Sequence, residues 1–169
     1  IINARILKRP DLIPQKITSL PQLQQWVQQW KLLGKKIAFT NGVFDILHQG
    51  HIFSLSQAAK EADVLIVAVN ADASVKRLKG ESRPVNDEAS RSLLLASLAI
   101  VDAVILFEED TPLSLIAALL PDVLVKGGDY TVEQIAGAKE VIANGGRVMI
   151  NPILEGFSTT SLIEQMKKS

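Results

Sequence analysis

The chain contains no cysteine and only two histidines among its 169 residues. The lack of cysteine excludes disulfide bonds and thiolate chemistry. No apolar run is long enough to cross a bilayer, and no charged-then-apolar leader is present, so neither a membrane partner nor export is expected. We therefore expect a cytoplasmic protein.

An excess of charge of one sign is also lacking, because 18 basic residues balance 18 acidic ones. Without a net positive field, the chain is not expected to bind nucleic acid. A hydrophobic fraction of 47% over this length indicates one compact domain with a sizeable core. The sequence begins with Ile1 rather than methionine, so we expect either a stand-alone protein or a domain of a longer one.

Short apolar runs alternate with helical patterns along most of the chain. This alternation predicts a parallel sheet covered on both faces, that is, a Rossmann-like, doubly wound α/β fold with five strands. We expect strands at 37–40, 64–69, 103–107, 123–125 and 147–150, and helices at 50–61, 87–99, 112–119, 132–144 and 159–166.

Residues 1–34 are predicted to form an N-terminal extension ahead of a domain that spans 35–169. The first twenty residues have no clear period, and their prolines favour extended chain. Apolar residues then recur at helical spacing from Pro21 to Leu33, which predicts an amphipathic helix. Its apolar face could pack on this domain, on a second copy or on another partner, so a homo-oligomer stays open.

Both histidines lie in the segment TNGVFDILHQGH, residues 40–51, directly after a predicted strand. A helix that opens from such a loop offers backbone N–H groups and the positive end of its dipole to a phosphate. His48 and His51 are three residues apart, so their rings can converge on one side. The standard phosphate loops GxxxxGK[ST] and GxGxxG are absent. The loop predicts a polyphosphate site, with packed histidines or a zinc site including Asp45 as alternatives.

The stretch GVFDILHQGH resembles the signature of the nucleotidyltransferase superfamily that carries an HxGH motif. Between about residues 35 and 163, the runs IVAVNADASVKRLKGESRPVN, VDAVILFEEDTP, PDVLVKGGDY and EGFSTTSLI resemble, in order, the D-glycero-β-D-manno-heptose 1-phosphate adenylyltransferases. The resemblance implies transfer of AMP from ATP, with Mg²⁺, to a sugar 1-phosphate. Pyrophosphate leaves, and the product is ADP-heptose, a lipopolysaccharide precursor. A stand-alone enzyme and a fusion to a sugar kinase domain both fit.

The resemblance assigns roles within the histidine loop. His48 and His51 are expected to donate hydrogen bonds to the ATP phosphates as charge builds up in the transition state. Asp45 is expected to orient the loop or to begin the helix. The remaining nucleotide-binding positions of the loop are Asn41, Gly42, Val43, Phe44 and Gly50.

Further cations are expected to hold the outer phosphates. The segment from Lys76 to Pro84 carries four cations and is interpreted as a Gly- and Pro-bearing loop at the ligand end of the sheet. Within it, Lys79 is the predicted catalytic cation, and a solvated charged face is the alternative. Arg91 matches the superfamily's arginine that reaches the phosphates, with an exposed helix residue as the alternative.

Two later segments complete the expected site. Lys126 and Asp129 flank the adjacent Gly127 and Gly128, which permit close approach of a ribose or base, although a plain turn would also explain them. The run Ser158, Thr159 and Thr160 opens the last predicted helix. One hydroxyl is expected to cap that helix, and the resemblance implies that its neighbours bind triphosphate.

Two other functions stay open at this point. Related cytidylyltransferases carry an arginine shortly before the Ser-Thr-Thr run, and residues 153–157 of this chain contain none. This difference favours ATP over CTP, while a cytidylyltransferase acting on glycerol 3-phosphate remains the enzymatic alternative. A module that senses ATP without turning it over is the alternative from another class.

Overall fold

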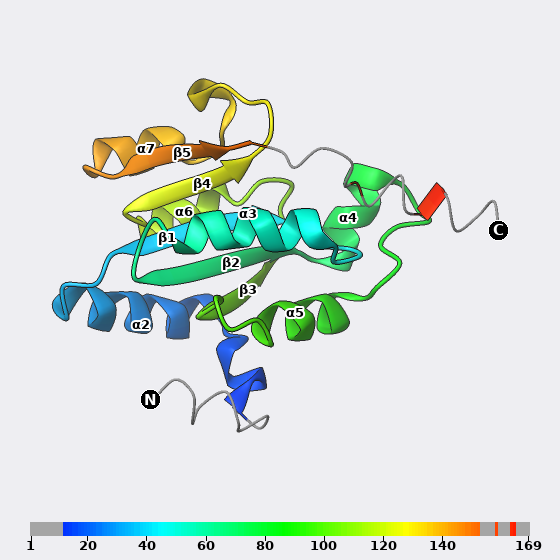
Figure 1. Cartoon of the computed structure of the whole chain (residues 1–169), viewed down its shortest axis with the longest axis horizontal. Helices are drawn as coiled ribbons and strands as arrows, with labels where there is room; N and C mark the ends of the chain where they lie inside the picture. The colour runs from blue at the N-terminus through cyan, green and yellow to red at the C-terminus, as the bar shows by residue number, and fades with distance from the viewer. Residues whose placement is uncertain (1–11, 153–157, 159–162, 165–169) are drawn as a thin grey trace.

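The computed structural model describes residues 12–152, 158 and 163–164. The five strands form one parallel sheet in the order β3-β2-β1-β4-β5 (Figure 1). The chain moves from β1 outward to β3 and then returns to the other side of β1, so the order of strands reverses between β1 and β4. The strands are β1 (Ile37–Gly42), β2 (Val64–Asn70), β3 (Ala103–Phe107), β4 (Val123–Gly127) and β5 (Arg147–Asn151). The expected Rossmann-like sheet is thus confirmed.

Helices cover both faces of this sheet, which makes the fold doubly wound. Buried residues of α3 (Gln49–Ala59) and α5 (Glu88–Ala96) pack against one face. Buried residues of α2 (Leu20–Leu32), α6 (Leu113–Leu119) and α7 (Ala138–Ala143) pack against the other. None of the helices in the described part of the chain is long and apolar enough to span a membrane.

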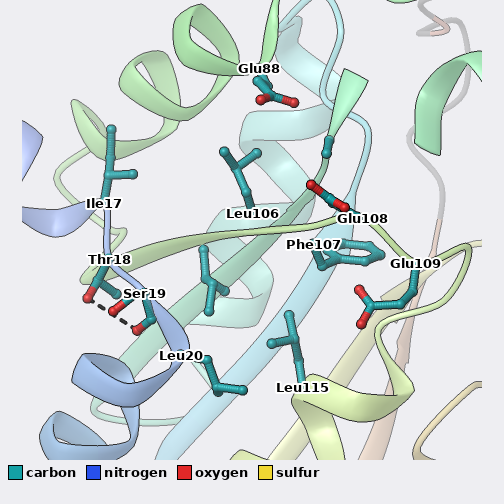
Figure 2. Close-up of a pocket in the computed structure, with 12 residues that line it drawn as sticks. Ile17, Thr18, Ser19, Leu20, Glu88, Leu106, Phe107, Glu108, Glu109 and Leu115 are labelled. Carbon is teal, nitrogen blue, oxygen red and sulfur yellow. Dashed lines mark hydrogen bonds between the residues drawn. The ribbon is translucent and has the colours of Figure 1, made fainter. Parts of the chain in front are cut away.

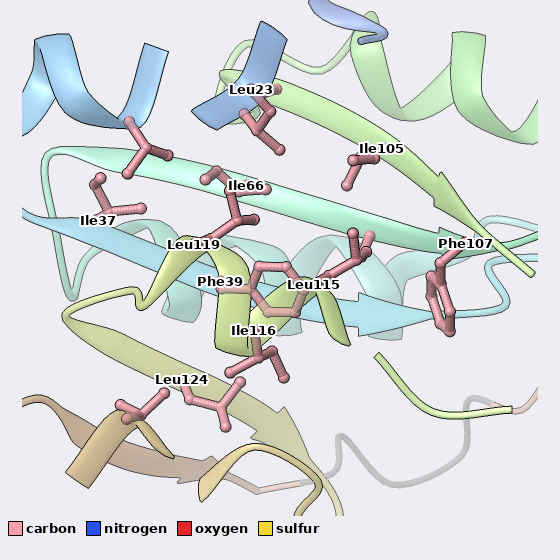
Figure 3. Packing of buried hydrophobic residues seen from close by; sticks show 14 of the residues in the cluster. Leu23, Ile37, Phe39, Ile66, Ile105, Phe107, Leu115, Ile116, Leu119 and Leu124 are labelled. Carbon is pink, nitrogen blue, oxygen red and sulfur yellow. The ribbon is translucent and has the colours of Figure 1, made fainter. Parts of the chain in front are cut away.

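The core is built by the alternation of side chains along each strand. Ile37 and Phe39 of β1 point into the cluster under α6, whereas Ala38 between them belongs to the cluster under α3 and α5 (Figure 3). Leu23 and Val27 of α2 are buried in the first of these clusters. The amphipathic helix of the predicted N-terminal extension therefore packs on this domain.

The helix predicted over 132–144 is interrupted. The chain forms a short 3-10 helix, η3 (Val132–Gln134), then turns, and begins α7 only after Gly137. Gly137 has a positive φ of 84°, and a Cβ on it would lie 2.5 Å from Cγ2 of Ile116. Left-handed backbone ends a regular helix, so the single predicted helix is wrong at this point.

The structure also contains α4 (Asp72–Lys79), which the sequence pattern did not reveal. Only Ser74 and Val75 of this helix are buried, so its hydrophobic period is too short to be recognised. At the N-terminal side, a 3-10 helix η2 (Pro14–Lys16) precedes Ile17, which forms a single bridge to Val104 of the edge strand β3. Residues 1–11 and most of the helix expected at 159–166 lie outside the described part.

Candidate functional site

The two histidines cap α3 with their own rings. His48 is the N-cap, and its Nδ1 accepts a hydrogen bond from the backbone N–H of Gly50 at 3.1 Å. His51 stands three positions later, and its Nδ1 accepts from the backbone N–H of His48 at 3.4 Å. This is a capping box in which imidazoles replace the usual hydroxyl and carboxylate. Because both Nδ1 atoms accept, each neutral ring carries its hydrogen on Nε2.

The rings also stack on one another. Their centroids are 3.9 Å apart with an interplanar angle of 28°, and the His51 ring lies 5.4 Å from that of Phe44. Burial, together with the neighbouring His48, lowers the pKa of His51 to about 4, and burial also lowers the pKa of His48. Both rings are therefore neutral near pH 7, so they can stack without forming a pair of cations, and Nε2 is the donor atom of each.

A cavity of about 160 Å³ opens beside these rings. It lies between the ends of β1 and β4, where the order of strands reverses, which is where α/β sheets bind ligands. The first turn of α3 contains no acidic residue, so no carboxylate of that turn offsets the positive end of the helix dipole. The residues that line the cavity are Thr40, Asn41, Gly42, Val43, Phe44, His51, Ser54, Leu55, Lys126 and Gly127.

Two glycines at this cavity leave room only for hydrogen. A Cβ on Gly42 would lie 3.0 Å from the ring of Phe44, and one on Gly127 would lie 3.2 Å from Oγ of Ser54. Phe44 itself has a left-handed φ of 51°, a conformation that is strained for an aromatic residue. The loop is thus closely packed around the cavity rather than a plain connection.

Lys126 is the cation of this cavity. It is half-buried, and burial lowers the pKa of its ammonium group. No carboxylate of a described residue lies within ion-pair distance of it, and its Nζ lies 5.6 Å from the centroid of the Tyr130 ring. A desolvated cation without an ion pair favours an incoming anion.

Asp45 holds the histidine loop to the segment before α5. Its carboxylate is 1% exposed and accepts from Nε of Arg83 at 2.6 Å and from the backbone N–H groups of Val85 at 2.8 Å and Asn86 at 3.0 Å. The N-cap of α3 is His48 rather than Asp45. Of the two interpretations considered for Asp45, orientation of the loop is the one that the structure shows.

Arg91 lies on α5, within the helix predicted for it, and its side chain contacts other parts of the protein. Its side chain is fully buried and donates to the carbonyl oxygens of Val43 and Asn70, both at 2.7 Å, to that of Asn86 at 2.9 Å, and to Oδ1 of Asp72 at 2.7 Å. Direct contact with phosphates does not match this geometry, and neither does an exposed helix position. Arg91 acts as a brace between the histidine loop, the end of β2 and the start of α4.

The predicted cation loop is mostly helix, which corrects the interpretation of that segment. Lys76, Arg77 and Lys79 lie on α4, and the loop begins only at Gly80. Arg77 forms an ion pair with Asp110 at 3.0 Å. Lys79 is exposed and does not line the cavity beside the histidines, so its contact with phosphate stays a prediction.

The other predicted positions are distributed as follows. Gly50 lies in the first turn of α3, and Asp129 is exposed in the turn after β4. Ser158 is exposed, whereas Thr159 and Thr160 lie outside the described residues. Sequence reasoning missed Thr40 and Ser54, which line the cavity. Ser54 could have been found, because it follows His51 by three residues and so shares its face of α3.

A larger hollow of about 600 Å³ lies at the edge strand β3, away from the histidines (Figure 2). Its wall includes Leu106 and Phe107 of β3 and the segment from Ile17 to Leu20. Three glutamates, Glu88, Glu108 and Glu109, also line it. Like charges repel, so this hollow is a poor site for a triphosphate despite its size.

Comparison with known proteins agrees with this geometry. Residues 39–165 match the family described as cytidylyltransferase-like. The bifunctional protein HldE of Rhodospirillum rubrum is 54% identical over 89% of this chain and 30% of its own length, and that of Klebsiella pneumoniae is 55% identical over 90% and 32%. The chain thus spans about a third of the length of these curated relatives.

A solved structure gives the same result. The lipopolysaccharide core biosynthesis protein from Thermoplasma volcanium is 34% identical to this chain and aligns with a TM-score of 0.57. The alignment covers 72% of this chain and 98% of that protein. This chain therefore shares its fold with that protein, nearly all of which is covered by the alignment.

Proposed function

Because the chain belongs to the cytidylyltransferase-like family, we propose that it is an adenylyltransferase that transfers AMP from ATP to D-glycero-β-D-manno-heptose 1-phosphate. The observation that carries the proposal is the stacked imidazole pair at the N-terminus of α3, beside the cavity at the point where the sheet reverses. Neutral rings with Nε2 hydrogens, a helix dipole and Lys126, which has no ion pair with a described residue, together form a site for a polyphosphate.

The proposed reaction is an in-line displacement. An oxygen of the sugar phosphate forms a bond to the α-phosphorus of ATP, the bond from that phosphorus to the bridging oxygen breaks, and pyrophosphate leaves with the electron pair. The attacking phosphate is ionised near pH 7, because its second pKa is about 6, so no general base is required. The protein positions both reactants, and His48, His51 and Lys126 stabilise charge at the transferring group.

The choice of ATP and heptose rests on several observations taken together. The chain lacks the arginine that related cytidylyltransferases carry before their Ser-Thr-Thr run. Its motifs resemble those of the heptose adenylyltransferases from the histidine loop to that run. The solved relative from Thermoplasma volcanium is named for lipopolysaccharide core biosynthesis, which agrees with a sugar acceptor.

We propose that Mg²⁺ binds to the protein together with the triphosphate. No group of three or more His, Cys, Asp or Glu side chains that could hold a metal ion exists among the described residues. The side chains at the cavity are neutral or cationic, so they do not fit a protein-bound Mg²⁺. An ion held by phosphate oxygens and water fits better, and no step above depends on it.

A sugar kinase is the partner activity that we propose, either fused or separate. The acceptor must be phosphorylated before adenylylation, and the curated relatives are bifunctional by name and about three times as long as this chain. Because we propose that both reactions use ATP, we also propose that they take place in the cytoplasm.

Pyrophosphate release tests the proposal directly. ATP, CTP, GTP and UTP are each supplied with the heptose 1-phosphate or with glycerol 3-phosphate, and only ATP with the heptose is expected to give rapid release. Turnover with CTP and glycerol 3-phosphate alone would assign the chain to the cytidylyltransferases. ATP binding without release from any pair would identify a sensor.

The histidines provide the matched mutational test. His48→Ala and His51→Ala each remove a donor to the transferring phosphates, and turnover is expected to fall on the order of 10²- to 10³-fold. Gln57→Ala, on the same helix and away from the cavity lining, is the control and should keep full turnover. Near-normal turnover in both variants would contradict the proposed role of His48 and His51.

A further inference from the structure

A second cavity of about 160 Å³ adjoins the one beside the histidines, and Asn41 and Lys126 line both. It lies between the loop that follows β3 and the loop that follows β4. The remaining residues around it are Asp110, Thr111, Pro112, Tyr130, Gln134, Ile135 and Ala136. A ligand in this second cavity would therefore meet a nucleotide in the first cavity at Asn41 and Lys126.

The side chains of the second cavity are arranged to bind hydroxyl groups. Oε1 of Gln134 accepts the backbone N–H of Thr131 at 2.9 Å, which leaves the Gln134 amide nitrogen as a donor. Oδ1 of Asp110 accepts from Arg77 at 3.0 Å, and no other described residue bonds its second oxygen. Thr111 adds a hydroxyl at the same cavity. Donor and acceptor groups thus stand side by side.

The wall formed by Tyr130 depends on Gly128. This glycine has a φ of 128°, and a Cβ on it would lie 2.8 Å from the Tyr130 ring. The ring can therefore fold back toward Lys126, with its centroid 5.6 Å from Nζ. The pair of glycines at the end of β4 thus shapes the second cavity through Gly128 and the first through Gly127.

We propose that the second cavity receives the sugar ring of the acceptor, with Asp110 and Gln134 as its specificity-determining residues and Lys126 on its phosphate. Hydroxyl groups around a sugar ring both donate and accept hydrogen bonds, as do the side chains here. The inference rests on the proposed function, because it assigns the acceptor of the same reaction.

The test measures the two substrates separately. In Gln134→Ala and Asp110→Asn, the KM for D-glycero-β-D-manno-heptose 1-phosphate is expected to rise about tenfold, as for loss of one polar contact, with the KM for ATP within twofold of wild type. Both side chains are exposed, so the variants should fold, which thermal melting verifies. Glu133→Ala, next to Gln134 but outside the cavity lining, is the control and should leave both KM values unchanged.

The outcomes separate this inference from the proposed function. If the wild-type protein turns over the heptose phosphate and both variants keep a normal KM for this acceptor, the cavity assignment is wrong and the proposed function still holds. A rise in the KM for ATP instead would assign the cavity to the nucleotide. If the wild-type protein releases pyrophosphate with no sugar phosphate, the proposed function fails, and the acceptor assignment fails with it.

Discussion

His48 and His51 combine two tasks that most proteins give to different residues. Their Nδ1 atoms satisfy the first backbone N–H groups of α3, as hydroxyls and carboxylates usually do. The ring of His51 lines the cavity, and the ring of His48 is stacked on it. A carboxylate in the capping box would repel a triphosphate, whereas a neutral imidazole caps the helix and can still donate from Nε2.

The lowered pKa of His51 predicts a pH dependence of stability. The unfolded ring takes up a proton near its ordinary pKa of 6.5, while the folded ring does so only near about 4. The contribution of His51 to the free energy of unfolding is therefore complete above pH 6.5 and is lost as pH falls toward 4. In urea titrations at pH 7 and pH 5, wild type should lose more stability than His51→Gln, whose side chain does not titrate. Equal losses would contradict the burial of a neutral ring.

At the scale of elements, α5 positions the histidine loop through Arg91. Its guanidinium donates to oxygens of the histidine loop, β2, α4 and the segment before α5. Asp45 ties the same loop to residues 83–86. Arg91 and Asp45 thus fix the loop that holds the imidazoles to the neighbouring segments.

Removal of this brace should destabilise the protein strongly. Arg91→Met leaves buried carbonyl groups and Asp72 without a partner, and we expect a loss of about 3 kcal/mol in the free energy of unfolding. Arg91→Lys should not restore it, because one ammonium group cannot reach oxygens on four segments. Arg77→Met, which breaks an exposed pair with side chains 51% and 63% accessible, is the control and should cost less than about 1 kcal/mol. Equal losses for Arg91→Met and Arg77→Met in chemical denaturation would refute the brace.

The break before α7 yields a second prediction at this scale. Gly137 and Gly145 have similar positive φ values, 84° and 82°, but only a Cβ on Gly137 meets another side chain, Ile116. Gly145→Ala should cost about 1 to 2 kcal/mol from backbone strain, and Gly137→Ala about 1 to 3 kcal/mol more from overpacking. Denaturant midpoints of the two variants measure the difference. If the midpoints coincide, packing against α6 does not set this turn.

At the scale of the whole molecule, the sheet reversal brings loops that are far apart in sequence to one cavity. The histidine loop ends at residue 51, and Lys126 lies 75 positions later; the two are neighbours only because β4 pairs with β1. A ligand that bridges these loops must stabilise the fold as a whole, because the unfolded chain has no such site.

Thermal melting with nucleotides measures this coupling. ATP at about 100 times its dissociation constant should stabilise the protein by about 2.7 kcal/mol, which corresponds to a rise of roughly 5–10 °C in Tm for a domain of this size. CTP at the same concentration should give a smaller rise, and Lys126→Met should reduce the effect of ATP. An equal rise with CTP would contradict selection of ATP by this protein.

The amino-acid sequence by itself determined the five strands, most helices and the placement of both histidines at a helix start. These features are local, because apolar periodicity and the spacing of three residues between His48 and His51 are properties of neighbouring positions. Helix α4 was not predicted, because Ser74 and Val75 are its only buried residues and two positions do not show a helical period. Gly137 interrupts an otherwise helical pattern because of a contact with α6 that no local signal reports.

Only the tertiary structure decided which charged residues meet a ligand and which brace the fold. The sequence predicts that both Arg91 and Lys126 bind the nucleotide, yet the first is enclosed by protein oxygens and the second lines two cavities. Asp110 and Gln134, which are far apart in sequence, likewise line one cavity. Pairing between distant strands sets these contacts, and it depends on how the whole chain buries its apolar surface rather than on any short stretch of residues.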